Sequence, residues 1–418
     1  MIKVRNKKKI KCYLFPTIWI CMIITTYIGV EEIFLLVAML VIGFISLGTF
    51  SKTLKFSRTD GFKYFVAYYV LISIIGLITN YVGIKNFIEL ILKYVCLPLF
   101  IVLIIPDEYD KRIVMLKALR LLIFISALYG FIECVLRYNF MVNLVQIDSK
   151  VWMETMNNTV NYQPSSFFLH YNYYGCILVL GIILIRFIPY KNKIFNLFCW
   201  VLLLEQILVS QSRICWIATL VLLIIEILHS KRITSRHLQR IILVFLCSIC
   251  IIIFEPSIFP YIGNFISNRF SRLQIYGFDD GSLGQRLGTL MNWPFYYQNN
   301  LIKGLFGTGY QSISVDYLKE YSFFKGYSTV DCELTVYLVE TGLMGVLILT
   351  RAIIQFIKKK SVSSIDELTV FRIGKMGIVV FIIECITLDI VSNNIMLSLL
   401  IAMLLVVNKR QVRKNNEL

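Results

Sequence analysis

The stretch Tyr13–Val30, YLFPTIWICMIITTYIGV, contains no charged residue. Only Glu31 and Glu32 separate it from a second uncharged block, residues 33–50, IFLLVAMLVIGFISLGTF. A helix rises about 1.5 Å per residue, so each block is long enough to cross about 30 Å of hydrocarbon. Two such blocks in succession indicate a pair of membrane-spanning helices and not the core of a soluble domain.

The whole chain repeats this pattern. Of its 418 residues 58% are hydrophobic, against about 45–50% in soluble domains, and the mean hydropathy is +0.74. We therefore expect an all-α fold, a polytopic bundle of about twelve transmembrane helices, the first of them retained and not cleaved as a signal sequence. The expected spans are 13–30, 33–50, 64–80, 87–105, 113–135, 173–189, 194–209, 213–229, 238–255, 333–352, 370–388 and 390–407.

The net charge of +17 indicates topology and contact with anionic lipids, since the basic residues lie in short segments between apolar blocks. We expect no nucleic-acid partner. With the N-terminus inside, the inner segments hold 27 Lys and Arg residues and the outer segments hold 10. The positive-inside rule then places both termini on the cytoplasmic side of the membrane.

Two long outer loops divide the chain. Residues 1–255 form nine expected spans with an outer loop at 136–172, and 256–332 form a large extracytoplasmic loop. Residues 333–418 form three more spans and a cytoplasmic tail. The large loop contains a predicted surface helix from Gln285 to Gln298, and no cysteine occurs between 256 and 331 to cross-link it.

Charged residues inside the spans require an explanation, because each adds about 2.5–3.5 kcal/mol to the free energy of membrane insertion. Glu89 and Lys93 have the i,i+4 spacing of an intrahelical ion pair. Most of the others lie toward the outer ends and indicate a polar cavity that opens outward: Glu133, Glu205, Arg213, Glu340, Glu384 and Asp389. A transporter would instead place its site near the midplane, between repeated helices, and we find no such repeat.

Two polar motifs precede expected spans on the outer side. The segment Ser165–Gly175 contains His170, which is either an interfacial side chain or a functional one. The segment Ser210–Arg213 ends with an arginine that can snorkel to the interface or present its fork of donors to a phosphate.

The large loop supplies further candidates. Its basic side chains Arg269, Arg272 and Arg286 are either solvated charges or a binding set for a diphosphate headgroup. Asp331 lies where the loop re-enters the membrane, and partial dehydration there favours a general base. The adjacent pair Asp279-Asp280 is flanked by glycine and indicates a turn, so we expect no metal site.

The glycines that follow are a turn or an anion nest. They occur as Gly307-x-Gly309 and then, in the helix that re-enters the membrane, as Glu340-x-Gly342-x-x-Gly345.

In this order, from about residue 165 to 350, the motifs resemble those of the O-antigen ligase and polymerase superfamily, which includes Wzy-type polysaccharide polymerases. The resemblance rests on His170-x-Asn172 with Gly175, on Ser210-x-Ser212-Arg213, on arginine in a long outer loop, and on the glycine motifs. It implies a GT-C-like bundle that transfers glycans from a polyprenyl-diphosphate carrier without a cofactor. Arg213 and Arg286 match the diphosphate-binding arginines, and Asp331 stands where ligases carry a histidine.

The resemblance predicts a polymerase of oligosaccharide repeat units for capsule, exopolysaccharide or O-antigen. Its catalytic base is Asp331 or His170, and its expected partners are the lipid-linked oligosaccharide, membrane lipids, a chain-length regulator and a flippase. Two alternatives remain: a ligase with the same donor and a different acceptor, or a lipid-linked-glycan flippase, which performs no chemistry. A long outer loop with arginines favours the transferases, because a flippase does not need it.

Overall fold

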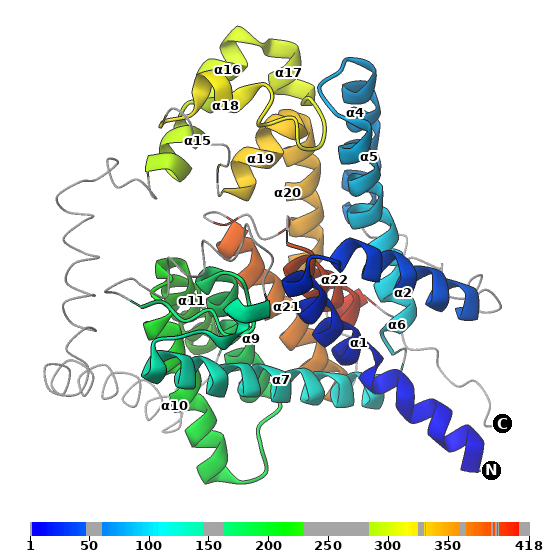
Figure 1. Cartoon of the computed structure of the whole chain (residues 1–418), viewed down its shortest axis with the longest axis vertical. Coiled ribbons are helices and arrows are strands. Elements are labelled where there is room, and N and C mark those ends of the chain that lie inside the picture. The colour runs from blue at the N-terminus through cyan, green and yellow to red at the C-terminus, as the bar shows by residue number, and fades with distance from the viewer. Residues whose placement is uncertain are drawn as a thin grey trace, which may run out of the picture.

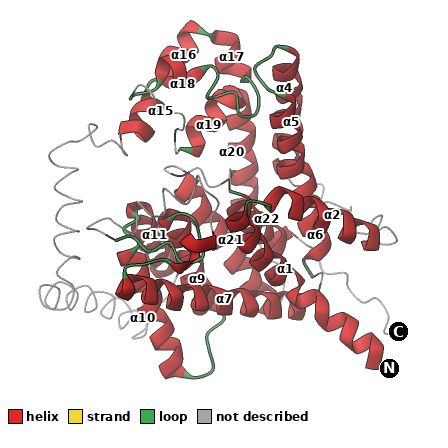
Figure 2. Cartoon of the chain, viewed as in Figure 1, coloured by secondary structure: helices red, strands yellow, loops and turns green. Residues whose placement is uncertain are grey.

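The structure is a computed structural model in which almost every element is a helix (Figures 1 and 2). It describes residues 2–46, 61–106, 108–144, 162–229, 284–324, 330, 332–358, 365–385, 388, 391 and 393–408. Within these ranges no strand occurs, so the expectation of an all-α fold is confirmed for this part of the chain.

The described part of the first half contains the helices α1 (Ile2–Ile28), α2 (Glu31–Ser46), α4 (Gly61–Ile78), α5 (Ile84–Ile91), α6 (Leu97–Ile104), α7 (Tyr109–Leu136), α9 (Tyr171–Phe187), α10 (Lys193–Val209) and α11 (Arg213–His229). A π-helical turn, η1 (Leu92–Cys96), joins α5 to α6, and a short 3₁₀ turn, η2 (Phe140–Leu144), follows α7.

The described part of the second half begins with short elements in the region predicted as the large loop: η4 (Gly284–Gly288), α15 (Thr289–Met291), α16 (Trp293–Asn299), α17 (Leu301–Phe306) and α18 (Tyr317–Tyr321). Four further helices complete the described chain: α19 (Glu333–Glu340), α20 (Gly342–Lys358), α21 (Ile365–Cys385) and α22 (Asn394–Asn408).

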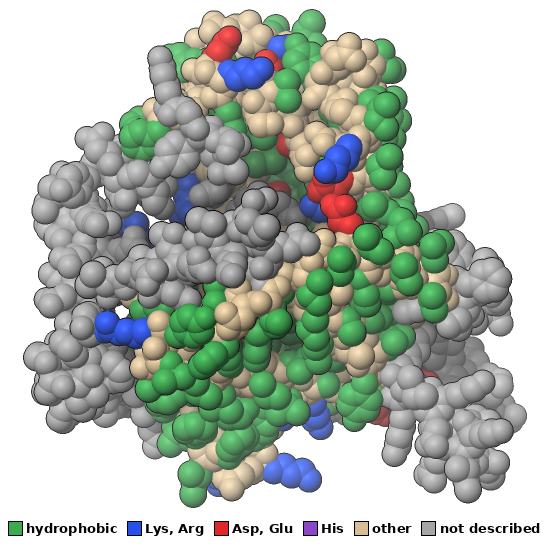
Figure 3. All heavy atoms as spheres, viewed as in Figure 1, with side chains coloured by type: hydrophobic (Ala, Val, Ile, Leu, Met, Phe, Trp, Pro, Cys, Tyr) green, Lys and Arg blue, Asp and Glu red, His purple; other side chains and the backbone are tan. Residues whose placement is uncertain are grey.

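Among the described residues, three helices are long and apolar enough to cross a membrane: Gly61–Ile78, Ile84–Ile104 and Tyr109–Leu136. Shorter apolar helices of 10–17 residues are Cys12–Ile28, Tyr171–Phe187, Arg213–Ile225 and Asn394–Val407. Hydrophobic side chains cover much of the face shown in Figure 3, and several on long helices are largely exposed, as Ile78 is at 75%. A soluble domain rarely exposes so much contiguous apolar surface, so these features indicate a membrane protein.

Most expected spans coincide with a helix, but two differ in continuity. The span predicted at 333–352 is broken into α19 and α20, because Gly342 takes a φ of +65° that residues other than glycine rarely adopt. The span predicted at 87–105 begins earlier, at Ile84, and contains the π turn. The span at 238–255 lies outside the described residues.

The largest core surrounds α9. Its side chains from Tyr174 to Ile185 are all buried, as expected for a helix that is hydrophobic on every side. Helices α7, α10, α11 and α21 pack against it. We call this part the aliphatic core; its other members come from α1, α6 and α22.

A second, smaller cluster lies between α4, α5 and α20. It contains Phe65, Tyr69, Leu90, Tyr310 and Tyr337, and we call it the tyrosine cluster. In Figure 1, α4, α5 and α20 run up the view whereas α7 runs across it, and α16 to α18 lie above α19.

Candidate functional site

The two motifs around His170 and Arg213 lie together in the structure. The Gln163 amide nitrogen donates to the Gln211 side-chain oxygen at 2.6 Å, and the Gln211 amide donates to the backbone carbonyl of Tyr162 at 3.2 Å. Helices α9 and α11, which His170 and Arg213 begin, are also in contact. In the sequence these two segments were related only by the order in which their motifs occur. The structure shows that they are hydrogen-bonded neighbours.

Glu133, at the end of α7, holds the first of these segments in place. It is 1% exposed, and its carboxylate accepts from the backbone N–H of Ser165 at 3.0 Å and of Ser166 at 2.7 Å. The Tyr162 hydroxyl donates to the same carboxylate at 2.7 Å. Burial and this carboxylate raise the pKa of Tyr162, which therefore remains a donor. One of the charges expected inside a span thus has a structural role.

His170 serves as the N-cap of α9. Its Nδ1 accepts from the backbone N–H of Asn172 at 3.1 Å, and its ring stacks on Tyr171 at a centroid distance of 4.3 Å. A neutral imidazole whose Nδ1 accepts carries its proton on Nε2. In this arrangement Nε2 is a donor, which favours a capping role over that of a general base.

Arg286 lies in the π turn η4, which precedes α15. Next to it, Gln285 donates to the Ser322 hydroxyl at 3.1 Å and accepts from the backbone N–H of Phe324 at 3.3 Å. Thr289 accepts from the backbone N–H of Phe323 at 3.1 Å. The half-buried Arg286 is therefore carried on a turn that the 322–324 segment anchors.

The helix predicted from Gln285 to Gln298 is present in interrupted form. It begins as η4, continues as α15 and restarts as α16 at Trp293, where Pro294 removes a backbone donor.

Three of the predicted site residues, Arg269, Arg272 and Asp331, lie outside the described residues, as do Asp279, Asp280 and Asp389. The residues on either side of Asp331 are described, and both are buried: Val330 is 3% exposed and Cys332 is 0% exposed. These two described residues are thus enclosed just before α19 begins.

The glycine motifs interlock two backbone segments. The N–H of Thr308 donates to the carbonyl of Val339 at 3.2 Å, and the N–H of Gly309 donates to the carbonyl of Glu340 at 2.9 Å. A Cβ on Gly307, whose φ is +87°, would lie 2.3 Å from the Glu340 carbonyl oxygen. Because these amide groups donate to carbonyls of the chain itself, the glycines form a tight turn and not an anion nest.

A network of hydroxyl and carboxylate groups extends through the tyrosine cluster, and sequence analysis did not find it. The Tyr69 hydroxyl donates to the Glu340 carboxylate. Glu89 accepts from the Tyr310 hydroxyl and from the Gln311 amide, each at 3.1 Å. Because burial and Glu89 raise the pKa of Tyr310, this hydroxyl stays protonated and donates.

The ion pair predicted between Glu89 and Lys93 is confirmed, with nitrogen and oxygen 2.6 Å apart. Lys93 lies in the π turn η1, an insertion that often marks functional positions in helices. The signal for this network was present in the sequence only as tyrosines scattered over α4, η1, the 307–316 loop and α19.

A cavity of about 750 Å³ lies beside this network. Side chains from α4, α6, α20, α21 and α22 make most of its wall apolar, and its polar groups include Lys93, Tyr94, Glu333 and Tyr337. Glu333 is 2% exposed and begins α19, two residues after Asp331. Of the described candidates, none of His170, Arg213 and Arg286 is among the residues that line it.

Within the part of the chain that the structure describes, no group of three or more His, Cys, Asp or Glu residues could hold a metal ion. The acidic pair Asp279-Asp280 lies outside the described residues. The absence of a metal requirement therefore stays a prediction.

Comparison with known proteins adds no assignment: no protein-family model matches the sequence, and a search of the curated proteins finds no match. The resemblance to the ligase and polymerase superfamily stays an expectation carried by the motifs.

Proposed function

We propose that this protein is a membrane glycosyltransferase that polymerises oligosaccharide repeat units delivered on a polyprenyl-diphosphate carrier. The proposal includes a GT-C-like bundle of about twelve spans in a bacterial inner membrane, with loop 256–332 outside and both termini in the cytoplasm. It requires a groove for a long apolar chain next to groups that can hold a diphosphate and accept a proton.

The observation that carries the proposal is the 750 Å³ cavity. Its apolar wall suits an isoprenoid chain, and its size falls within the 300–1,000 Å³ typical of ligand pockets. Its polar wall includes Glu333, beside the point where the loop containing Asp331 returns to the bundle. A lipid in this cavity would bring its polar end toward that segment.

The hydrogen bonds between the outer motifs support the same function. The segments of His170 and Arg213 meet through Gln163 and Gln211, and Arg286 is carried on an anchored turn. Both arginines precede a helix, and rigid elements hold charged groups more accurately than loops do. Such arginines can bind a diphosphate through their planar fork of donors.

In the proposed reaction a hydroxyl oxygen of the acceptor sugar attacks the anomeric carbon of the donor. The new glycosidic bond forms as the bond between that carbon and the diphosphate oxygen breaks, and the polyprenyl diphosphate leaves. Arg213 and Arg286, with Arg269 and Arg272, stabilise the charge that grows on the leaving group. Asp331 accepts the hydroxyl proton, while His170 caps α9.

The test is a reaction of purified protein in detergent with a synthetic lipid-linked repeat as both donor and acceptor. We expect products that contain two or more repeats on one carrier, together with released polyprenyl diphosphate. Consumption of the donor only when a different acceptor is added would identify a ligase.

A flippase would produce no new glycosidic bond, but it would move the lipid across vesicles that contain the protein. The apolar cavity suits this alternative as well, so the same preparation should be reconstituted and assayed for transport. Transport without polymer formation would overturn the proposal.

A further inference from the structure

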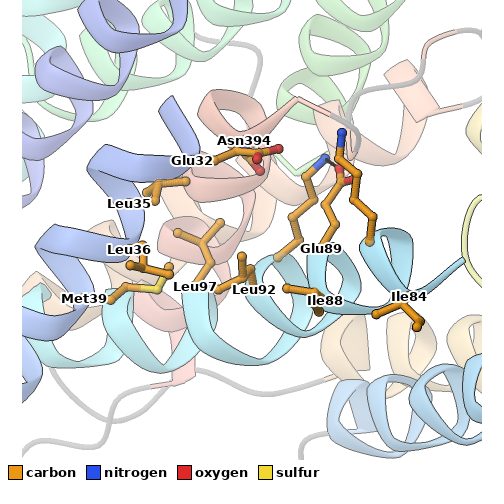
Figure 4. Close-up of a pocket in the computed structure, with 12 residues that line it drawn as sticks. Glu32, Leu35, Leu36, Met39, Ile84, Ile88, Glu89, Leu92, Leu97 and Asn394 are labelled. Atoms are coloured by element: carbon orange, nitrogen blue, oxygen red, sulfur yellow. Dashed lines mark ion pairs between the residues drawn. The ribbon is translucent and has the colours of Figure 1, made fainter. Parts of the chain in front are cut away.

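A second cavity, of about 330 Å³, lies between α2 and the helix formed by α5, η1 and α6 (Figure 4). It is smaller than the cavity described above. The two cavities share one lining residue, Lys93, which lies in the turn η1. The proposed reaction uses none of its other residues. Its occupant can be inferred from the arrangement of its charges.

One side of the cavity is apolar. It contains aliphatic side chains and a methionine: Leu35, Leu36, Met39, Ile84, Ile88 and Leu92. Several of these are partly open to the surroundings, Ile84 at 70% and Ile88 at 54% exposure. Such a surface on a membrane protein suits acyl chains.

The other side carries charged and polar groups at two places. Figure 4 shows Glu32 and Asn394, from α2 and the start of α22, at one end of the cavity, and Glu89 farther along α5. Lys85 belongs to the same lining. Since Glu89 pairs with Lys93 at 2.6 Å, Glu32 contributes the remaining negative charge and Lys85 the remaining positive charge.

Asn394 adds a specific requirement. The side chain is 8% exposed, and its carbonyl oxygen Oδ1 is buried and accepts no hydrogen bond from the described residues. A buried acceptor without a donor costs free energy. A ligand that donates a hydrogen bond would satisfy this oxygen, and a cationic ligand would pair with the neighbouring Glu32 carboxylate.

The residues of the polar side come from helix ends that the charge distribution places on the outer face. Glu32 lies between the first two expected spans, Lys85 lies between the third and fourth, and Asn394 begins α22. Lipid headgroups occupy this level of a bilayer, with their chains directed toward the hydrocarbon.

We infer that this cavity binds a zwitterionic phospholipid with a primary ammonium group, of the phosphatidylethanolamine class. Its ammonium donates to the Glu32 carboxylate and to Asn394 Oδ1, its phosphate faces Lys85, and its chains follow the aliphatic wall. A primary ammonium has three N–H donors, whereas the quaternary ammonium of phosphatidylcholine has none. The site is separate from the transferase reaction and does not depend on it.

The test uses the unaltered protein and a series of lipids that differ only in N-methylation. Full-length protein is reconstituted with equimolar mixtures of phosphatidylethanolamine, its N-methyl and N,N-dimethyl forms, phosphatidylcholine and phosphatidylglycerol, and the retained lipids are counted by native mass spectrometry. We expect retention to fall with each methyl group, to about one tenth for phosphatidylcholine, because hydrogen bonds to charged groups are worth about a factor of ten or more. Equal retention across the series would overturn the inference, as would stronger retention of phosphatidylglycerol, which has no ammonium.

Variants assign the effect to this cavity. Glu32→Gln and Asn394→Leu should each reduce the preference for phosphatidylethanolamine over phosphatidylcholine, while Lys85→Gln should reduce retention of both and leave their ratio unchanged. Glu320→Gln and Lys319→Gln change exposed charges outside the cavity and should behave as the parent does. A preference that survives both Glu32→Gln and Asn394→Leu would place the lipid elsewhere and refute the inference.

Discussion

The aliphatic core and the tyrosine cluster differ in the partners of some of their buried charged groups. In and around the core, Glu133 accepts from two backbone amides as well as from the Tyr162 hydroxyl, and Arg112 donates to the carbonyls of Pro106 at 3.0 Å and Val406 at 3.1 Å. In the tyrosine cluster the bonds join side chains to side chains, as between Tyr310 and Glu89. This second network adjoins the larger cavity.

The difference separates structural charges from candidates for chemistry. A carboxylate that bonds to backbone amides is held in one place and secures a loop. A hydroxyl or carboxylate that faces a cavity can exchange a solvent partner for a substrate. We therefore expect substitutions in the core region to lower stability first, and substitutions beside the cavity to lower activity first.

The largest effect on activity should come from Asp331→Asn. Asparagine keeps the size and polarity of the side chain but cannot accept the proton, so polymer formation should fall by about 10²–10⁴-fold at matched expression. Glu333→Gln provides the comparison, because Glu333 is buried in the cavity wall two residues away. If Glu333→Gln loses this activity while Asp331→Asn works near the parental rate, the base is Glu333 and the assignment of Asp331 is wrong.

Arg213→Lys and Arg286→Lys should lower the rate by about tenfold or more, less than the 10²–10³ typical of removing a transition-state donor outright. Lysine retains the charge but loses the planar fork. The measurement is the rate of polymer formation at saturating lipid-linked repeat, and Lys319→Gln on the exposed part of the loop is the control. Full activity in both lysine variants would exclude a bidentate role for the arginines.

Glu133→Ala should reduce the free energy of unfolding by about 3 kcal/mol. It leaves the buried amides of Ser165 and Ser166 and the Tyr162 hydroxyl without their acceptor, and each unsatisfied group costs about 1–3 kcal/mol. Thermal unfolding in detergent measures the change, and Glu320→Ala on the surface is the control. A variant as stable as the parent would show that the 162–170 segment is held by other contacts.

Gly307→Ala should be destabilising by about 2 kcal/mol, because a Cβ there meets the Glu340 carbonyl and a positive φ strains alanine. Gly83→Ala is a matched control: no atom lies within 4 Å of its added Cβ, so the change should stay within about 0.5 kcal/mol. Equal effects of the two substitutions in thermal unfolding would contradict the interlocked turn.

The smallest expected effect is that of chelators. If the reaction depends on arginines and a carboxylate alone, activity should be unchanged in excess EDTA. Activity that is lost and then restored only by a divalent ion would make Asp279 and Asp280 the first residues to examine.

Sequence analysis was most successful where the signal is local. The blocks at 64–80, 113–135 and 173–189 correspond to α4, α7 and α9 to within four residues at each end, because an apolar stretch in lipid must satisfy its backbone hydrogen bonds within itself and does so as a helix. It also identified the Glu89–Lys93 pair, whose members lie one turn apart on a helix.

Sequence analysis was weaker for the roles of single polar residues. His170 was a candidate base by its position before a span, yet its Nδ1 caps the helix that it precedes. The glycines of the 304–310 segment were interpreted as either a turn or an anion nest, and only the partners of their amide groups distinguish the two. In each case the deciding contact comes from the folded backbone.

The sequence by itself determined that this chain is helical and belongs in a membrane, because the hydrophobicity and the length of a helix depend on residues that are neighbours in the sequence. Tertiary structure decided which polar groups meet. Tyr310 bonds to Glu89 across 221 positions of sequence, and Tyr69 bonds to Glu340 across 271. No periodicity in the sequence predicts such pairs. They depend on how α4, α5 and α19 pack, and on the short turn at Gly307 and Gly342 that brings α19 beside α4 and α5.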